Sequence, residues 1–454
     1  EFNCLFCYCP LYPREVCPGN PTFIKKDDGR IVKRCTDCTF PHKSENYERI
    51  MNLLRTKKEE CDFSEEFHHG GEVDFCSDFS VNTNPLGLSE SVKSSIKNAL
   101  DLCEKYPDQN CTELREKLAK KISEKRLSPS KPLESESIIF GNGASELISL
   151  VVAAISPKNA LLLAPTFSGY ERALKANGAK IHYHFLKREN KFALDESILD
   201  LFEEKRAGRG EAKIPPDMIF LCNPNNPTGQ MIEPNLLEKI VALCEEKGIF
   251  LVIDECFIDF TERAGETAMR FVGNCPHLIV INAFTKIFAM AGLRLGYLVT
   301  SNFALRQKIK FLQPEWSVSS LAQIAGIAAL EEEDYIQKTR EIVKSERDFL
   351  AKELKALGFE VYPSEANFIL VNAEDFLMKN FEKRESLADS QLQNIIKMSE
   401  KFDNFLKKHG IFLRNCGNFK NLDETYYRLA VKTHEENEKL IEILRSFVYQ
   451  NSNL

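Results

Sequence analysis

The sequence predicts an α/β protein with a large, mostly parallel sheet, a smaller α+β domain after it, and a small cysteine-rich module before it. Apolar strand-like runs alternate with helical patterns over residues 111–320, as in parallel sheets covered on both faces. From residue 321 this alternation gives way to a long helical pattern and separate strand-like runs. Six of the 15 cysteines fall within the first 38 residues. We therefore predict a cysteine-rich, metal-binding module (1–60), an arm or connector (61–110), a large domain (111–320) and a small C-terminal domain (321–454).

The composition excludes several classes of function. The chain has 454 residues, of which 43% are hydrophobic and 28% charged, as in globular proteins of two or three domains. A net charge of −7 argues against nucleic acid as a partner. No apolar run approaches the roughly 20 residues that span a bilayer, and no signal peptide is recognisable. Single cysteines scattered through apolar runs suggest a reducing cytoplasm. The chain begins at Glu1 rather than Met, so residues can precede it.

The large domain is predicted element by element. SIIFGNGASELISLVVAAI indicates a strand, a glycine turn and a helix, and ALLLAPTFSGYERALKANGAKIHYHFL a strand, a turn, a helix and a strand. MIFLCNPNNPTG is a strand that ends in a turn, and LLEKIVALCEEKGIFLVIDECFIDF is a helix followed by a strand. HLIVINAF and LRLGYLVTS are two further strands.

The small domain is predicted to begin with a long helix over residues 335–357. EVYPSEANFILVNA indicates a pair of strands, GIFLRNC one strand, and YYRLAVKTHEENEKLIEILRSF a strand and a helix. Residues 379–408 are charged and helix-prone, and we interpret them as a solvated insertion without chemistry.

Polar residues follow several strands of the predicted sheet, where ligands of α/β proteins bind. Asp254 ends one strand, Asn226 lies in the NPNNPTG turn, and Lys286 follows HLIVINAF. GNGAS opens a helix whose N–H groups and dipole suit a phosphate. Each feature alone is more often structural. Together with Arg294 they match pyridoxal 5′-phosphate (PLP), which needs a lysine, a carboxylate at its ring nitrogen, a donor at its phenolic oxygen and a phosphate cradle.

The order GNGAS, PTFSGY, NPNNPTG, DECFIDF, FTK, GLRLG resembles fold-type-I PLP enzymes, in particular the histidinol-phosphate aminotransferase branch, over residues 65–450. The resemblance implies that Lys286 holds PLP, Asp254 pairs with the ring nitrogen and Asn226 contacts the phenolic oxygen. It also implies ring stacking by Phe167, and phosphate binding by Ala144, Ser145, Thr285 and Arg294.

Two further points come from this resemblance. KYPDQN is similar to a segment whose tyrosine reaches the phosphate of the neighbouring subunit, so Tyr106 implies a homodimer with shared sites. One departure is Phe257, where many relatives carry a tyrosine, so the phenolic oxygen is expected to have one donor fewer.

Two segments resemble L-threonine-O-3-phosphate decarboxylases of cobalamin synthesis. They are HHGGEVDFCSDFSVNTNPLG (68–87) and FLRNCGNFKNLDETYYRLAVKTHEENEKL. A phosphate and a carboxylate together need several fixed cations. The substrate-binding residues implied are His69 (with His68 as an alternative), Gly70, Asn82, Asn226, Arg414 and Arg428. A plainer alternative is that Arg428 alone binds an α-carboxylate and that His69 is a surface residue.

The predicted reaction is therefore decarboxylation of L-threonine O-3-phosphate or L-serine phosphate. These substrates differ by one methyl group, and Val81 and Thr83 are candidates for the surface that contacts it. A histidinol-phosphate-type aminotransferase is the alternative. A third hypothesis makes the N-terminal module a metal-dependent binding or sensing unit beside a degenerate PLP domain, and the intact set of Lys286, Asp254 and Arg294 argues against it.

The N-terminal module contains two C-x-x-C pairs, Cys4–Cys7 and Cys35–Cys38, a pattern typical of tetrahedral zinc. Cys9, Cys17 and His42 could supply further ligands. The segment resembles the cysteine-rich small domain associated with cobamide-synthesis proteins. An iron–sulfur cluster and free structural cysteines are the alternatives to zinc. Its role in the protein is not apparent from the sequence.

Overall fold

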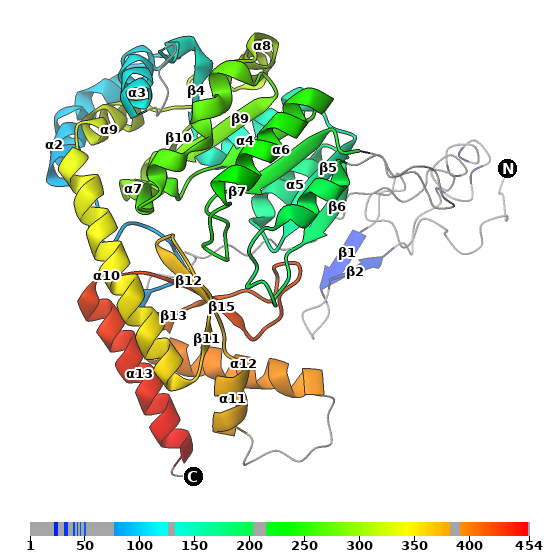
Figure 1. Cartoon of the computed structure of the whole chain (residues 1–454), viewed down its shortest axis with the longest axis vertical. Coiled ribbons are helices and arrows are strands. Elements are labelled where there is room, and N and C mark those ends of the chain that lie inside the picture. The colour runs from blue at the N-terminus through cyan, green and yellow to red at the C-terminus, as the bar shows by residue number, and fades with distance from the viewer. Residues whose placement is uncertain are drawn as a thin grey trace. The chain divides into compact units, whose positions relative to one another are not determined.

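The computed structural model describes residues 22–25, 31–34, 40, 43, 46, 50, 77–125, 132–202, 215–381 and 391–452 (Figure 1). The chain divides into two units, residues 1–65 and 66–454. In the first unit, β1 (Thr22–Lys25) pairs with β2 (Ile31–Arg34) in antiparallel register.

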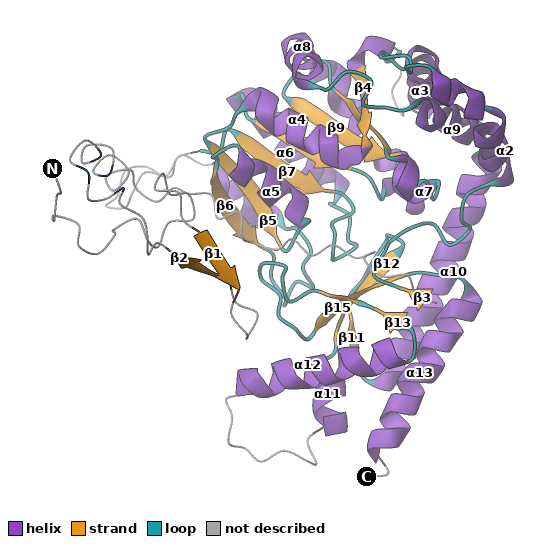
Figure 2. Ribbon diagram, turned by 180° about the vertical axis from the view of Figure 1, so that it is seen from behind, coloured by secondary structure: helices purple, strands orange, loops and turns teal. Residues whose placement is uncertain are grey.

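The large domain is built on a sheet of seven strands (Figures 1 and 2). In spatial order they are β4 (Ile138–Asn142), β10 (Leu295–Val299), β9 (Leu278–Ala283), β8 (Phe250–Asp254), β7 (Met218–Cys222), β5 (Asn159–Ala164) and β6 (Lys180–Phe185). β10 runs antiparallel to both of its neighbours, and all other neighbouring pairs are parallel. The prediction of a mostly parallel sheet is therefore confirmed.

Helices cover both faces of this sheet because successive strand residues point to opposite sides. Leu161 and Leu163 of β5 pack into one hydrophobic cluster, whereas Leu162 packs into the other. The first cluster is completed by α3 (Thr112–Lys125), α6 (Pro234–Lys247) and α9 (Ser320–Leu330). The second is completed by α4 (Gly143–Ile155), α5 (Ser168–Ala176) and α8 (Phe303–Leu312).

The small domain has an antiparallel sheet. In spatial order its strands are β11 (Glu360–Val361), β12 (Phe368–Asn372), β15 (Tyr426–Ala430) and β14 (Arg414–Asn415). Its core also takes residues from α10 (Glu333–Leu357), α11 (Glu374–Phe381), α12 (Gln391–Lys408) and α13 (His434–Ser452). The long helix α10 joins the two domains, since Val343 packs into the large-domain core and Leu350 into the small-domain core. Among the described helices, none combines the length and the apolar character needed to cross a bilayer.

The described chain after residue 76 starts in the small domain and then crosses to the large one. β3 (Ser77–Asp78) pairs in parallel with β13 (Ile411–Phe412), and the next residue, Phe79, is fully buried in the small-domain core. The sequence did not predict the helix that follows, α2 (Glu90–Asn98). Its side-chain cap is Ser89, which accepts from the Val92 N–H.

Two sequence interpretations are wrong. Residues 379–408 are not a solvated insertion, because Met398, Phe402 and Leu406 of α12 are buried in the small-domain core beside α11 (Figure 2). The charges lie on the outer face of this amphipathic helix, which explains the misreading. GIFLRNC is not one strand but two short ones, β13 and β14, which belong to different sheets.

Candidate active site

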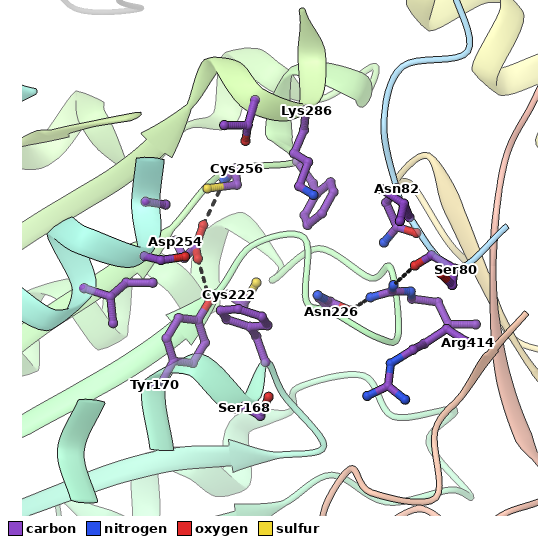
Figure 3. Close-up of a pocket in the computed structure, with 18 of the residues that line it drawn as sticks. Ser80, Asn82, Ser168, Tyr170, Cys222, Asn226, Asp254, Cys256, Lys286 and Arg414 are labelled. Carbon is purple, nitrogen blue, oxygen red and sulfur yellow. Dashed lines mark hydrogen bonds between the residues drawn. The ribbon is translucent and has the colours of Figure 1, made fainter. Parts of the chain in front are cut away.

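A cavity of about 250 Å³ lies where strands of the large sheet end and the small domain begins (Figure 3). It is lined by most of the residues predicted for cofactor and substrate binding. These are Asn82, Ala144, Ser145, Phe167, Asn226, Asp254, Thr285, Lys286, Arg294, Arg414 and Arg428. Ser80 and Arg428, which are 348 residues apart in sequence, thus meet at one place.

Lys286 reaches the cavity from α7 (Phe284–Ile287), a single helical turn that begins directly after β9. Its Nζ lies 5.9 Å from the centre of the Phe257 ring. Burial lowers the pKa of the Lys286 ammonium to about 8, and the positive charges of Arg428 and Arg294 act in the same direction. An amine with such a pKa is neutral often enough near pH 7–8 to attack a carbonyl group.

Asp254 is buried at the carboxyl end of β8 and is held in one orientation. Its Oδ2 accepts a hydrogen bond of 2.7 Å from the Tyr170 hydroxyl, and its Oδ1 accepts one of 3.0 Å from the Cys256 N–H (Figure 3). Burial and the Asp254 charge hold the pKa of Tyr170 well above its ordinary value, so the hydroxyl remains a donor. The carboxylate is therefore fixed as an acceptor at the base of the cavity.

A cradle for an anion forms where the N-terminus of α4 meets Arg294. A Cβ on Gly143 would lie 2.4 Å from Arg294 Nη2, and Gly143 has a φ of +74°. A Cβ on Gly296 would lie 2.6 Å from the Ala144 amide nitrogen. The two glycines thus let a guanidinium and a strand approach the first N–H groups of a 13-residue helix. Such N–H groups, with a bidentate cation, are suited to a phosphate.

Asn226 connects the cofactor side of the cavity to the substrate side. Its Oδ1 accepts a 2.7 Å hydrogen bond from Arg428 Nη1, and Arg428 Nη2 donates to the Ser80 carbonyl over 2.6 Å (Figure 3). The amide orientation follows from this contact, since the oxygen faces the guanidinium and the NH₂ group remains able to donate. The Nε of Arg428 is buried without a hydrogen-bond partner in the described residues.

The cavity is strongly positive. Its described lining includes four cations, Lys286, Arg294, Arg414 and Arg428, and a single carboxylate, Asp254. Burial lowers the pKa of Arg428 to about 10, and the charge of Arg414 acts in the same direction. The Arg414 guanidinium is held by the Asn418 side chain at 2.7 Å and by the Asn415 carbonyl, and it lies 5.2 Å from the Phe419 ring centre. An arrangement of this kind suits a ligand with more than one anionic group.

These residues fit PLP. The Gly143–Arg294 cradle fits its phosphate, the Asp254 carboxylate its ring nitrogen, and the Asn226 amide its phenolic oxygen. Phe167, at the start of α5, offers an aromatic ring for stacking and meets the Tyr170 ring edge-on at 5.4 Å. Phe257 also lines the cavity and has no hydroxyl, so it cannot donate to the phenolic oxygen.

Asn82 has a buried polar atom that no residue of the described chain satisfies. Its side chain is 2% exposed, and its Oδ1 has no hydrogen-bond partner within the described chain. Leaving a buried acceptor unpaired costs about 1–3 kcal/mol, so a donor from a bound molecule is expected here. Of the two candidates for the methyl-contacting surface, Val81 lines the cavity and Thr83 does not.

Some predicted residues are not in this cavity. Tyr106 is 79% exposed and stacks on Trp316, with ring centres 4.4 Å apart. His68, His69 and Gly70 lie outside the described residues. So do the predicted metal ligands Cys4, Cys7, Cys9, Cys17, Cys35, Cys38 and His42. Within the described ranges, no group of three or more metal-ligating side chains gathers.

Several residues that line the cavity were not predicted from the sequence. Tyr170 is the most important of them, and its only signal was its place at the end of the PTFSGY motif. Ser80 contributes through its carbonyl group, which no side-chain pattern reveals. The thiols of Cys222 and Cys256 also line the cavity, and burial raises the pKa of both. They are therefore neutral packing groups.

Comparisons with known proteins agree with this geometry. A family described as "Aminotransferase class I and II" matches residues 76–444, and one described as "Cysteine-rich small domain" matches residues 1–65. The chain is 34% identical over 391 residues to threonine-phosphate decarboxylase of Salmonella typhimurium, covering 83% of this chain and 96% of the relative.

Two further similarities bear on function. The adenosylcobalamin biosynthesis bifunctional protein CobDQ of Leptospira interrogans is 32% identical over 374 residues, which are 82% of this chain and 39% of that relative. The solved structure of histidinol-phosphate aminotransferase from Clostridium acetobutylicum matches with a TM-score of 0.68 and 30% identity, covering 84% of this chain and 100% of that one.

Proposed function

The chain belongs to the aminotransferase class I and II family, and from this premise we propose that it is a PLP-dependent decarboxylase of a phosphorylated amino acid in cobalamin biosynthesis. The substrate is L-threonine O-3-phosphate or L-serine phosphate. The similarity to threonine-phosphate decarboxylase over most of both chains favours this reaction over transamination.

The observation that carries the substrate class is the pair of guanidinium groups, Arg414 and Arg428, on the small-domain side of the cavity. Arg294 lies against the helix N-terminus and is taken up by the phosphate of the cofactor. Arg414 and Arg428 then remain for a substrate with both a phosphate and a carboxylate. We assign Asn82, whose buried oxygen has no hydrogen-bond partner among the described residues, as the acceptor for the substrate amino group.

PLP, when bound, supplies an electron sink for the pair of electrons left at Cα when a bond breaks. Asp254, held by Tyr170, keeps a negative charge at the ring nitrogen and so maintains that sink. Arg428 and Arg414 would hold the two anionic groups of the substrate, and this clamp would fix the orientation of the bonds to Cα. Orientation of this kind can supply a large part of the rate enhancement.

Lys286 is the group that moves a proton. With PLP and substrate bound, Lys286 would hold a proton at Nζ; in the protein itself, burial lowers the pKa of this ammonium to about 8. It then donates a proton to Cα, in the position that the departing CO₂ has vacated. The product is aminopropanol phosphate from threonine phosphate, or ethanolamine phosphate from serine phosphate.

A decarboxylation assay tests this function. Purified protein with PLP is supplied with L-threonine phosphate and no keto acid, and we expect CO₂ release over many turnovers. The same assay with L-serine phosphate compares two substrates that differ by one methyl, a difference worth about 1–3 kcal/mol. Turnover of histidinol phosphate that appears only with 2-oxoglutarate would assign the aminotransferase reaction instead.

The aminotransferase is the second candidate because the structural match to histidinol-phosphate aminotransferase is as extensive as the sequence match to the decarboxylase. Both reactions use the same lysine, aspartate and phosphate cradle. They differ in which bond to Cα is perpendicular, so the residues around Arg414 and Arg428 decide between them.

We also propose a homodimer in which Tyr106 completes the partner's site. The support is its 79% exposure, next to the exposed residues Leu100, Leu102 and Trp316. Mixing Tyr106→Ala and Lys286→Ala proteins tests this, because a hybrid dimer has one site with both residues intact. Random mixing should restore about a quarter of wild-type activity, whereas a monomeric site predicts no recovery.

For the N-terminal module we propose zinc held by Cys4, Cys7, Cys35 and Cys38, on the basis of their spacing and the match to the cysteine-rich small domain. Metal analysis by mass spectrometry, together with a visible spectrum, distinguishes zinc from an iron–sulfur cluster. We further place the protein in the cytoplasm, where free thiols such as Cys103 and Cys275 persist.

A further inference from the structure

A second, smaller cavity lies beside β4, the edge strand of the large sheet, away from the candidate active site. It measures about 80 Å³ and is bounded by the segment before α3, by β4, and by the chain that follows α8. These elements lie together at one end of the large domain (Figure 1). A cavity of this size holds a few water molecules, which suits a single small ion and excludes a nucleotide.

Arg115 is the first of two cations in the lining. Its Nε is buried and has no hydrogen-bond partner, and its guanidinium forms no ion pair within the described chain. A half-buried guanidinium with unused donors is costly unless an anion meets it. The Arg115 side chain therefore indicates a ligand that is not part of the described chain.

Lys310 is the second cation in the lining, and it likewise forms no ion pair within the described residues. Partial burial lowers its pKa, and the positive charges of Arg115 and Arg306 act in the same direction. This small cavity therefore brings together two cations that repel each other.

One carboxylate also lines this cavity, but it is engaged elsewhere. Asp108 accepts the Asn110 N–H at 2.9 Å on Oδ1 and the Thr112 N–H at 2.7 Å on Oδ2, at the start of α3. Against the effect of burial, hydrogen bonds from Thr112 and Asn110 lower the pKa of Asp108, and the charge of Arg115 adds a smaller effect in the same direction. Within the lining, Arg115 and Lys310 exceed Asp108 by one charge. The exposed carboxylate of Glu136, outside the lining, also acts on both cations.

We propose that this cavity is a binding site for a small oxyanion of phosphate type, held by Arg115 and Lys310. None of its residues lines the candidate active site of the same subunit. Trp316, which lines this second cavity, stacks on Tyr106, so the site adjoins the face that the proposed homodimer uses. Its occupancy would also fix the chain around Trp316, which lines the cavity and stacks on Tyr106.

The chain carries its own reporter, since Trp316 lines this cavity and is the single tryptophan among the 454 residues. Titrating the PLP-loaded protein with inorganic phosphate, at constant ionic strength set with chloride, should give a saturable change in tryptophan fluorescence. Parallel titrations with sulfate and with a phosphate monoester show whether a free ion or an esterified phosphate is preferred. The small volume leads us to expect the free ion.

Variants assign the response to this cavity. Arg115→Gln should raise the half-saturating phosphate concentration at least about tenfold, which corresponds to about 1.4 kcal/mol. Lys310→Gln should have a similar effect and, being on an exposed side chain, should fold normally. Lys120→Gln, which removes the same charge from an 80% exposed side chain of α3, should leave the titration unchanged. Arg414→Gln should also leave it unchanged, which separates this site from the active-site cavity.

Two results would overturn the proposal. One is a phosphate response that is absent, or equal in Arg115→Gln and wild type. The other is a dimer that dissociates in Arg115→Gln with no phosphate response in either protein, which would mean that a carboxylate of a second subunit neutralises Arg115. Circular dichroism and the PLP absorbance band of each variant establish that the comparison is made on folded holoenzyme.

Discussion

Arg414 and Arg428 are direct register partners on the antiparallel strands β14 and β15. Like charges at directly opposed positions of a strand pair destabilise the sheet. Burial lowers the pKa of Arg428, and Arg414 lowers it further. The pairing of the two arginines therefore lowers the stability of the fold, and it provides a site that can receive an anion.

Replacing Arg414 by Gln should weaken substrate binding without lowering the stability of the protein. We expect KM for the phosphorylated substrate to rise at least about tenfold, because one charge-assisted contact is lost. The melting temperature should stay constant or rise, because the repulsion of Arg428 is removed. Arg445→Gln is the matched control, since it makes the same change at an ion pair on α13, remote from the cavity. A lower melting temperature for Arg414→Gln with unchanged KM would contradict this account.

Tyr170→Phe tests the hydrogen bond that orients Asp254. A bond to a charged acceptor contributes about 1.5–3 kcal/mol, so we expect a loss of that order in unfolding free energy and a fall of about tenfold in kcat. KM should change little, because Tyr170 does not meet the substrate anions. Tyr335→Phe removes a comparable bond of 2.6 Å to the Gly87 carbonyl outside the cavity. It should cost stability without affecting kcat, and equal kcat effects of both variants would refute a specific role for Tyr170.

The pKa of Lys286 predicts how cofactor uptake depends on pH. Only the neutral amine attacks an aldehyde, and burial, Arg428 and Arg294 lower the ammonium pKa from 10.5 to about 8. In cofactor-free protein, the rate of PLP incorporation should rise about tenfold per pH unit below pH 8 and level off above it. Arg428→Gln should move the inflection upward, because it removes a positive charge. The growth of the PLP absorbance band measures the rate, and a rate that still climbs at pH 10 would exclude the lowered pKa.

A comparison of two glycine variants, Gly143→Ala and Gly178→Ala, separates the effect of crowding at Arg294 from that of backbone strain. Both glycines have a φ near +70°, so alanine is strained at either position. Only at Gly143 would the added Cβ meet the Arg294 guanidinium, at 2.4 Å, whereas nothing lies within 4 Å at Gly178. We expect similar losses of stability but a PLP dissociation constant raised at least about tenfold for Gly143→Ala alone. Equal PLP affinity in the two variants would count against the cradle.

Replacing Glu255 by Gln should change how the free energy of unfolding depends on pH. Glu255 is fully buried, accepts from the Ala268 N–H at 2.7 Å and from the Thr267 hydroxyl, and burial raises its pKa from 4.5 to about 8. The folded state thus binds a proton that the unfolded state has released between these pH values. This contribution to stability is complete below pH 4.5 and is lost as the pH rises through 8.

Urea unfolding at pH 5 and pH 8 measures this effect. Wild type should lose unfolding free energy on the order of a few kcal/mol more than Glu255→Gln over that interval. The exposed Glu315→Gln serves as the control and should follow wild type. Parallel behaviour of wild type and Glu255→Gln would show that Glu255 is ionised in the folded protein.

The sequence predicted the large sheet because its strands are buried on both faces and read as continuous apolar runs between helical patterns. The small domain was harder to predict. Its strands are as short as two residues, and α12 has enough charge on its outer face to resemble a solvated insertion. Tyr170 was not predicted because its partner, Asp254, lies 84 residues away in sequence. No local pattern indicates that a hydroxyl group donates to a carboxylate so far along the chain.

Local sequence patterns were sufficient to indicate the chemistry, through a lysine, an aspartate, an asparagine and an arginine in the order and spacing that PLP requires. These groups follow strand ends and turns, which local patterns reveal. How these groups act together depends on the tertiary fold. It set Arg414 opposite Arg428 and turned the Asn226 oxygen toward Arg428. It also left the Arg115 Nε, at a second cavity, without a hydrogen-bond partner among the described residues. Such relationships depend on strand register and on contacts over hundreds of residues, and these are fixed by packing rather than by local sequence.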